Sequence, residues 1–77
     1  MTKQLILYGT DGCHLCEQAR ERVFEALGNS IDLVEVDILD DEQLEARYAT
    51  SIPVLRSSIG EDELSWPFDI EQIQQLL

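Results

Sequence analysis

Hydrophobic and polar positions change their period along the chain. Residues 4–8 form a short apolar run that is typical of a buried strand. In the next segment apolar residues recur at a spacing of four, at Leu15, Ala19, Val23 and Leu27. This spacing predicts a helix with one apolar face, on which Leu15 packs inward. The helix is expected to end at residues 28–29, a Gly-Asn pair that tolerates the left-handed conformation of a helix C-terminus.

The second half of the chain carries three further strand patterns. Residues 31–38 are rich in β-branched side chains, which favours a strand. Residues 52–55 form another, with Pro53 at its start, where a strand tolerates proline. A turn at residues 58–61 then returns the chain as a fourth strand over residues 63–66, so that the last two strands form a hairpin.

Two more helices are predicted from their start signals. For the first, Asp40 is the expected cap and Gln43 completes a capping box, with Leu39 and Leu44 forming a hydrophobic staple. This helix is expected to end near Ala49.

The last helix shows the same start signals. Here Asp69 and Gln72 form the box, while Phe68 and Ile73 form the staple. Its predicted apolar stripe consists of Ile70, Ile73 and Leu77. The order of elements is therefore β-α-β-α-β-β-α. It predicts one α/β domain over residues 1–77, with a four-stranded mixed sheet and helices on both of its faces.

Charge narrows the classes of partner. The 77 residues include 16 acidic and five basic side chains, which give a formal net charge of −11. Binding to nucleic acid or to an anionic membrane needs clustered Lys and Arg, so neither is expected. The acidic surface indicates a solvated face or attraction to a basic partner. No stretch resembles a signal peptide or a transmembrane segment, and the expected location is cytoplasmic.

Cys13 and Cys16 are the two cysteines of the chain, three positions apart at a predicted strand–loop–helix junction. In the first turn of a helix such residues share one face, and their sulfurs can approach disulfide distance. At a helix N-terminus, unpaired N–H groups and the helix dipole favour a thiolate. Such positions lower a cysteine pKa from about 8.5 to about 3.5–7.5. We therefore expect Cys13 to be the more exposed attacking thiolate and Cys16 the partly buried resolving thiol.

The remaining chemistry of this segment stays open. His14 follows the predicted nucleophile and would stabilise its thiolate as an imidazolium, or it is an exposed residue without a special role. Metal binding is the alternative for the two cysteines. Zinc prefers four ligands, and the chain has two cysteines and one histidine. A closed metal site within one chain is not expected, although a dimer would allow a shared metal or iron–sulfur cluster.

Residues 8–16 (Tyr-Gly-Thr-Asp-Gly-Cys-His-Leu-Cys) and residues 51–54 (Ser-Ile-Pro-Val) resemble the glutaredoxin branch of the thioredoxin-like superfamily. The likeness is closest to small bacterial glutaredoxin-like proteins with a Gly-Cys-His-Leu-Cys segment. It implies a thioredoxin-like fold in which Pro53 is cis and the Ile52 backbone faces the sulfurs to pair with an extended substrate. It also implies that the backbone N–H of Asp69 contributes to substrate binding.

The predicted function is thiol–disulfide exchange on a protein disulfide or a small-molecule disulfide. No cofactor is expected to be required, glutathione is the co-substrate that the resemblance implies, and the chain is expected to act as a monomer. Two alternatives belong to other classes. One is a non-catalytic binding module that docks a partner through its acidic face or near Trp66 and Phe68. The other is a dimeric carrier of a metal or an iron–sulfur cluster.

Overall fold

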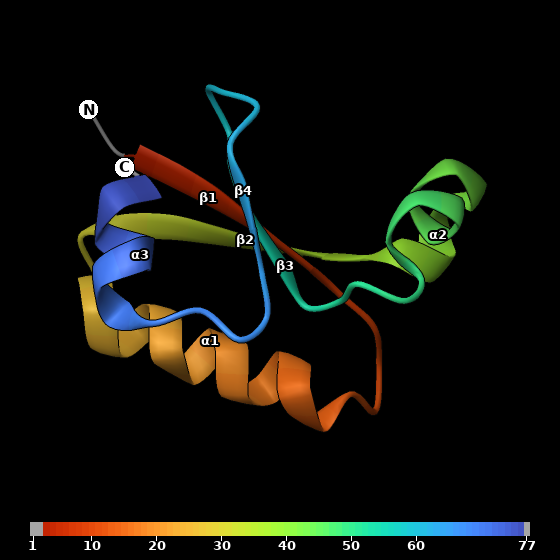
Figure 1. Cartoon of the computed structure of the whole chain (residues 1–77), viewed down its shortest axis with the longest axis horizontal. Coiled ribbons are helices and arrows are strands. Elements are labelled where there is room, and N and C mark those ends of the chain that lie inside the picture. The colour runs from red at the N-terminus through yellow and green to blue at the C-terminus, as the bar shows by residue number, and fades with distance from the viewer. Residues whose placement is uncertain (1–2, 77) are drawn as a thin grey trace.

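The computed structural model describes residues 3–76, without the side chain of Lys3. Its elements follow the predicted order, with one additional 3-10 turn (Figure 1). The strands are β1 (Lys3–Gly9), β2 (Ile31–Asp37), β3 (Val54–Ser57) and β4 (Glu63–Ser65). The helices are α1 (His14–Leu27), the 3-10 turn η1 (Ile38–Asp40), α2 (Glu42–Tyr48) and α3 (Ile70–Leu76).

The four strands form one mixed sheet in the order β2-β1-β3-β4. β1 pairs with β2 in parallel and with β3 antiparallel, and β3 pairs with β4 antiparallel. Gly9 at the end of β1 lies opposite Asp37 at the end of β2. The loops that follow these two strands therefore leave the sheet at the same edge. The β3–β4 turn lies at the other end, because Ser57 is paired with Leu5 near the start of β1.

Helices α1 and α3 cover one face of the sheet. Seven buried residues form the core on this side: Leu5, Leu7, Ala19, Val23, Leu55, Phe68 and Ile73. The half-buried Trp66 ring joins this core and meets the Phe68 ring edge-on, with ring centroids 5.2 Å apart. The Arg22 guanidinium lies 5.6 Å from the Trp66 ring centroid and donates a hydrogen bond to the Phe68 carbonyl. Both aromatic residues therefore contribute to the core on this face.

Helix α2 covers the opposite face (Figure 1). Tyr8 and Val54 from the sheet pack there against Ile38 and Tyr48, and the Tyr8 and Tyr48 rings stack with centroids 4.7 Å apart. The Tyr48 hydroxyl donates a 2.8 Å hydrogen bond to Glu63 Oε2. Burial, followed by this hydrogen bond, raises the pKa of Tyr48 above its usual value. Helices therefore lie on both faces of the sheet, as predicted.

The start of α2 differs from the prediction. The capping residue is Asp41, whose Oδ1 accepts a 2.8 Å hydrogen bond from Gln43 N, and not Asp40. Asp40 instead closes η1, a turn that Asp37 caps by accepting from Leu39 N. Because this turn buries Ile38, the Leu39 side chain is 62% exposed, and the predicted hydrophobic staple is absent.

The start of α3 agrees with the prediction. Asp69 N donates to Gln72 Oε1 and Gln72 N donates to Asp69 Oδ1, at 3.0 and 2.8 Å. Phe68 and Ile73 are both buried in the same core. Ile70 is exposed, however, so its place in the apolar stripe was wrong, and Leu77 lies outside the described residues.

No helix in the described part of the chain is long and apolar enough to cross a lipid bilayer.

Candidate active site

The two cysteines lie where β1 passes through a short loop into α1. Cys13 is the N-cap of α1, with extended backbone angles, and its Sγ accepts a 3.1 Å hydrogen bond from the backbone N–H of Cys16. The first turn closes through Glu17 N, which donates to the Cys13 carbonyl at 3.2 Å. A helix N-cap normally uses a side-chain oxygen to accept such a bond. Here the Cys13 sulfur takes that position.

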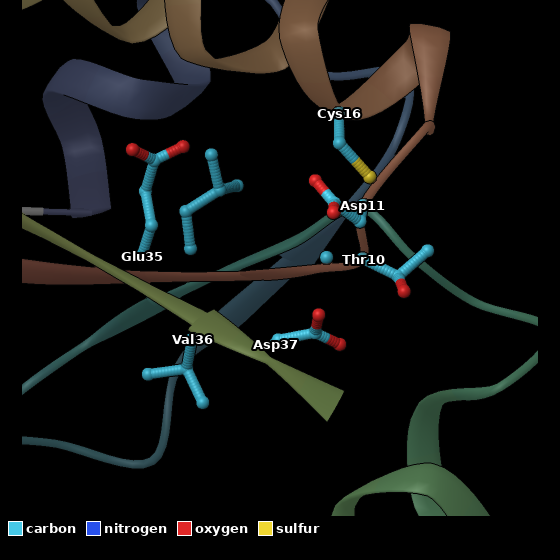
Figure 2. A pocket seen from close by; sticks show the side chains of 8 residues that line it. Thr10, Asp11, Cys16, Glu35, Val36 and Asp37 are labelled. Carbon is cyan, nitrogen blue, oxygen red and sulfur yellow. The ribbon is translucent and has the colours of Figure 1, made fainter. Parts of the chain in front are cut away.

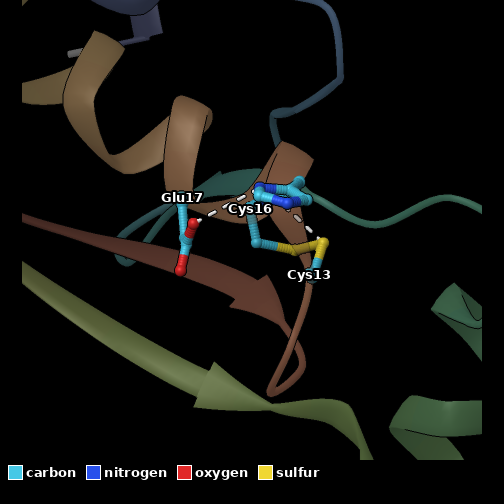
Figure 3. Close-up of a disulfide and its surroundings, with 4 residues drawn as sticks. Cys13, Cys16 and Glu17 are labelled. Atoms are coloured by element: carbon cyan, nitrogen blue, oxygen red, sulfur yellow. Dashed lines mark hydrogen bonds and ion pairs between the residues drawn. A yellow bond between two sulfur atoms is a disulfide. The ribbon is translucent and has the colours of Figure 1, made fainter.

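Cys13 and Cys16 are joined by a disulfide (Figure 3). Their Cα atoms are 5.2 Å apart, which lies within the range that disulfides require. Both side chains are half-buried, so the bond is accessible at the molecular surface. The expectation that the helical spacing brings the two sulfurs together is therefore met.

Gly9 allows α1 to approach the sheet at this point. A Cβ atom at residue 9 would lie 2.9 Å from Cys16 Sγ and 3.2 Å from Cys16 Cβ. Any larger side chain would therefore displace the Cys16 sulfur or the end of the strand. Gly9 belongs to the segment that resembles glutaredoxins, but its close approach to Cys16 was not predicted from the sequence.

Two adjoining hollows flank the disulfide. The larger, of about 260 Å³, extends over the ends of β1 and β2, and the smaller, of about 150 Å³, lies along the first turn of α1. Cys16 and Asp11 line both of them. Figure 2 shows the carboxylates of Asp11, Glu35 and Asp37 around the same hollow as the Cys16 sulfur. Glu17 adds a fourth carboxylate in the smaller hollow.

In the described part of the chain, the only basic side chain in the lining of either hollow is Arg20, which lines the smaller one. Its guanidinium lies 3.6 Å from Glu35 Oε1, and both side chains are about half exposed. Sequence analysis did not identify Glu35 and Asp37 as neighbours of the disulfide. A signal was present, since both follow Leu33 on one face of the strand at its carboxyl end. The carboxyl ends of adjacent parallel strands meet at one edge of a sheet.

The two residues between the cysteines point outward. His14 is 92% exposed, and its Nδ1 lies 3.7 Å from Glu17 Oε2 in the next turn. Leu15 is 46% exposed, so the prediction that it packs inward was wrong. The apolar face of α1 that packs in the core includes Ala19 and Val23, which are fully buried.

The other predicted binding residues lie outside these two hollows. The Ile52–Pro53 peptide bond is cis, as the resemblance implied. Ile52 N donates to the Tyr48 carbonyl at 3.1 Å, and Pro53 is fully buried. The backbone N–H of Asp69 is bonded to Gln72 Oε1. Their roles toward a substrate stay predictions.

The described residues do not form a metal site. Within residues 3–76, no three His, Cys, Asp or Glu side chains are grouped so that they could hold a metal ion. The disulfide itself leaves neither sulfur as a thiolate ligand in this form. The described residues thus form a half-buried disulfide whose Cys13 sulfur caps α1, with carboxylates nearby.

The fold and the site together define the class. A mixed four-stranded sheet with helices on both faces, and a Cys-x-x-Cys pair at the start of α1, is a thioredoxin-like arrangement of the glutaredoxin type. The chain belongs to the family described as Glutaredoxin-like domain (DUF836), which matches residues 4–77. No protein with a curated description matches the chain significantly.

Solved structures of two bacterial proteins are similar to the chain. The X-ray structure of protein XcR50 from X. campestris is 39% identical, with 92% of this chain and 91% of that chain covered and a TM-score of 0.77. The solution structure of protein Ne2328 from Nitrosomonas europaea is 31% identical, with 100% and 93% covered and the same TM-score. These similarities extend over nearly the whole length of all three chains.

Proposed function

We propose that the protein is a thiol–disulfide oxidoreductase, with Cys13 as nucleophile and Cys16 as resolving thiol. The observation that carries the proposal is the position of the Cys13 sulfur. It replaces the usual capping oxygen at the N-terminus of α1 and accepts the Cys16 N–H at 3.1 Å. The same hydrogen bond and the helix dipole would stabilise a Cys13 thiolate once the disulfide is reduced.

The reaction starts from the reduced dithiol. The Cys13 thiolate attacks one sulfur of a substrate disulfide and forms a mixed disulfide, and the released substrate thiolate takes a proton from solvent. The Cys16 thiol then loses its proton to solvent, and its thiolate attacks the Cys13 sulfur and expels the second substrate sulfur as a thiolate, which takes a proton from solvent. The dithiol gives two electrons to the substrate. The products are two substrate thiols and the Cys13–Cys16 disulfide.

Accessory residues have narrower roles in this proposal. His14 lies on the exposed side of the first turn, where an imidazolium would add positive charge near the nucleophile. Ile52 and Pro53 would guide an extended substrate, using the Ile52 carbonyl, since its N–H is already bonded to Tyr48. Asp69 would have to exchange its hydrogen bond to Gln72 for one to the substrate. No resident cofactor is part of the proposed reaction.

Cysteine alkylation as a function of pH tests the assignment of roles. Rates are measured with iodoacetamide on the reduced Cys13→Ser and Cys16→Ser variants, each of which retains one thiol. We expect the apparent pKa of Cys13 to lie below neutrality and that of Cys16 to lie well above neutrality. A free thiol has a pKa of about 8.5. Oxidoreductase activity is measured as the reduction of bis(2-hydroxyethyl) disulfide, a neutral substrate. This activity should be lost in the Cys13→Ser variant.

The result that contradicts the proposal is equal reactivity of the two thiols, with both pKa values near that of a free thiol. Unfolding of a variant is detected by circular dichroism, and the Cys16→Ser variant supplies a second readout. It should accumulate a mixed disulfide on Cys13, visible as a mass increase. A docking module would keep its partner after Cys13→Ser, and a cluster carrier would be coloured when purified without oxygen.

A further inference from the structure

We propose that the carboxylates around the disulfide make the protein selective for cationic disulfides and unfavourable to anionic ones, glutathione disulfide included. The inference rests on the proposed function and names its substrate class. The reacting group is the Cys13–Cys16 pair itself. The carboxylates are specificity determinants that act on the part of the substrate next to its sulfur atoms.

The charges around the pair come from three separate segments. Asp11 belongs to the loop before α1, Glu17 to the first turn of α1, and Glu35 and Asp37 to the end of β2. Asp11 and Glu35 line both hollows beside Cys16, whereas Glu17 lines only the smaller hollow and Asp37 only the larger one. A substrate bonded to Cys13 must place its neighbouring atoms in or beside the smaller hollow, because both cysteines line it, and the larger hollow adjoins it through Asp11, Cys16 and Glu35.

The balance of charge in this setting is negative. Among the described side chains, Arg20 is the only basic one in the lining of these hollows, where it belongs to the smaller hollow and lies 3.6 Å from Glu35 Oε1. The Asp37 carboxylate also accepts a hydrogen bond from Leu39 N. This bond holds the carboxylate in place but does not neutralise its negative charge. Asp11 and Glu17 are exposed, and Glu17 Oε2 lies 3.7 Å from Nδ1 of the exposed His14 ring. A cationic group next to the substrate sulfur would be attracted here, while a carboxylate would be repelled.

Clefts lined by charges of one sign raise the rate at which oppositely charged substrates arrive, and added salt weakens this effect. The net charge of −11 acts on a charged substrate from every side of the molecule. A local effect must therefore be separated from this general one. The sheet register provides a control position, because Glu61 is an exposed residue of the β3–β4 turn, at the opposite end of the sheet from the disulfide (Figure 1).

The test compares three small disulfides with the reduced protein at neutral pH. Cystamine carries two positive charges, bis(2-hydroxyethyl) disulfide is neutral, and dithiodiglycolate carries two negative charges. Each rate constant is divided by that of dithiothreitol with the same disulfide, which removes differences in leaving-group reactivity. At low salt we expect the normalised rate for cystamine to exceed that for dithiodiglycolate about tenfold or more. The ratio should fall steeply at high salt.

Matched variants locate the effect. In the Asp11→Asn/Glu35→Gln double variant we expect the cystamine-to-dithiodiglycolate ratio to fall at least about threefold at low salt. Glu61→Gln should leave the ratio near that of the unmodified protein. A change in the pKa of Cys13 caused by the double substitution alters all three rates together and cancels in the ratio.

Failure of this inference is distinguishable from failure of the proposed function. If the neutral disulfide is reduced but the ratio is near one, or if the double variant keeps the ratio of the unmodified protein, charge selection by these carboxylates is refuted and the oxidoreductase assignment stands. If the neutral disulfide is not reduced at all, both fall. Glutathione disulfide, run as a fourth substrate, should follow dithiodiglycolate.

Discussion

Gly9 is the last residue of β1 and lies close to Cys16 of the disulfide. Its backbone does not adopt a positive φ angle, so another residue would meet no backbone strain there. The constraint comes from space alone, because an added Cβ would lie 2.9 Å from Cys16 Sγ. In the disulfide that sulfur is held in place, whereas in the dithiol Cys16 is free to change its rotamer. A side chain at residue 9 should therefore destabilise the oxidised form more than the reduced form.

The Gly9→Ala variant is expected to be easier to reduce than the unmodified protein. Overpacking at a tight contact costs about 1–3 kcal/mol, and the oxidised form bears most of this cost. Since about 30 mV corresponds to 1.4 kcal/mol for a two-electron couple, the reduction potential should become less negative by about 20–60 mV. It is measured by equilibration in dithiothreitol redox buffers, with the dithiol fraction read by alkylation and mass.

Gly60→Ala is the matched control for this substitution. Gly60 also lacks a positive φ angle, and a Cβ there would meet only Asp62 N at an ordinary 4.0 Å. Its potential should stay within the error of the measurement. An unchanged potential in Gly9→Ala, in a variant that folds, would show that the contact relaxes equally in both redox forms.

The sequence predicted the reactive pair better than its surroundings. Spacing and a helix start were enough to place Cys13 at the N-cap, since both signals are local. The exposure of Leu15 was not predictable from its period, because burial depends on which helix residues the rest of the fold covers. The position of Glu35 beside the disulfide required the parallel register of β1 and β2, which involves residues distant in sequence.

At the level of secondary-structure elements, the N-terminus of α2 is decided by tertiary contacts. Asp40 and Asp41 are adjacent and chemically identical, yet only Asp41 caps the helix, by accepting from Gln43 N at 2.8 Å. Ile38 is buried against the face of the sheet that packs on α2, and the 3-10 turn that begins with Ile38 ends at Asp40. Asp40 therefore belongs to this turn and cannot cap α2. Local pattern predicted that a helix begins here, but its first residue followed from packing.

Alanine substitution of the two aspartates separates these roles. Asp41→Ala should lower the free energy of unfolding by about 0.5–2 kcal/mol, because an N-cap hydrogen bond is lost. Asp40→Ala removes the same charge without removing a cap, and its effect should stay within about 0.5 kcal/mol. Both values come from urea denaturation. A larger loss for Asp40→Ala would contradict the structural assignment of the cap.

The element order as a whole was predictable because most of its signals are local. The apolar run at residues 4–8, the glycine at residue 28 and the capping box at Asp69 and Gln72 each depend on neighbouring residues. Details that differ, such as the exposed Ile70, depend on how far α3 extends over the core. Short helices carry few periods, so the pattern defines their buried face only loosely.

At the scale of the whole molecule, repulsion between like charges opposes the compact fold. The sequence carries a net charge of −11. Against this, the ion pairs among the described side chains are the three at 3.6–4.0 Å that involve His14, Arg20 and Arg47. Pairs at such exposed positions contribute little each. Long-range repulsion should therefore outweigh local attraction in its effect on stability.

Added salt should therefore stabilise the protein. Raising sodium chloride from about 10 mM to 150 mM shortens the Debye length from about 30 Å to about 8 Å, which screens repulsion across a molecule whose longest extent is 31 Å. We expect a gain of about 1 kcal/mol, which raises Tm by about 4–8 °C in a domain of this size. Thermal unfolding followed by circular dichroism measures this change in Tm.

Sodium chloride is used because sulfate also strengthens apolar burial. A fall in Tm over this range would mean that the ion pairs dominate, and an unchanged Tm would mean that the charges are spaced widely enough not to interact.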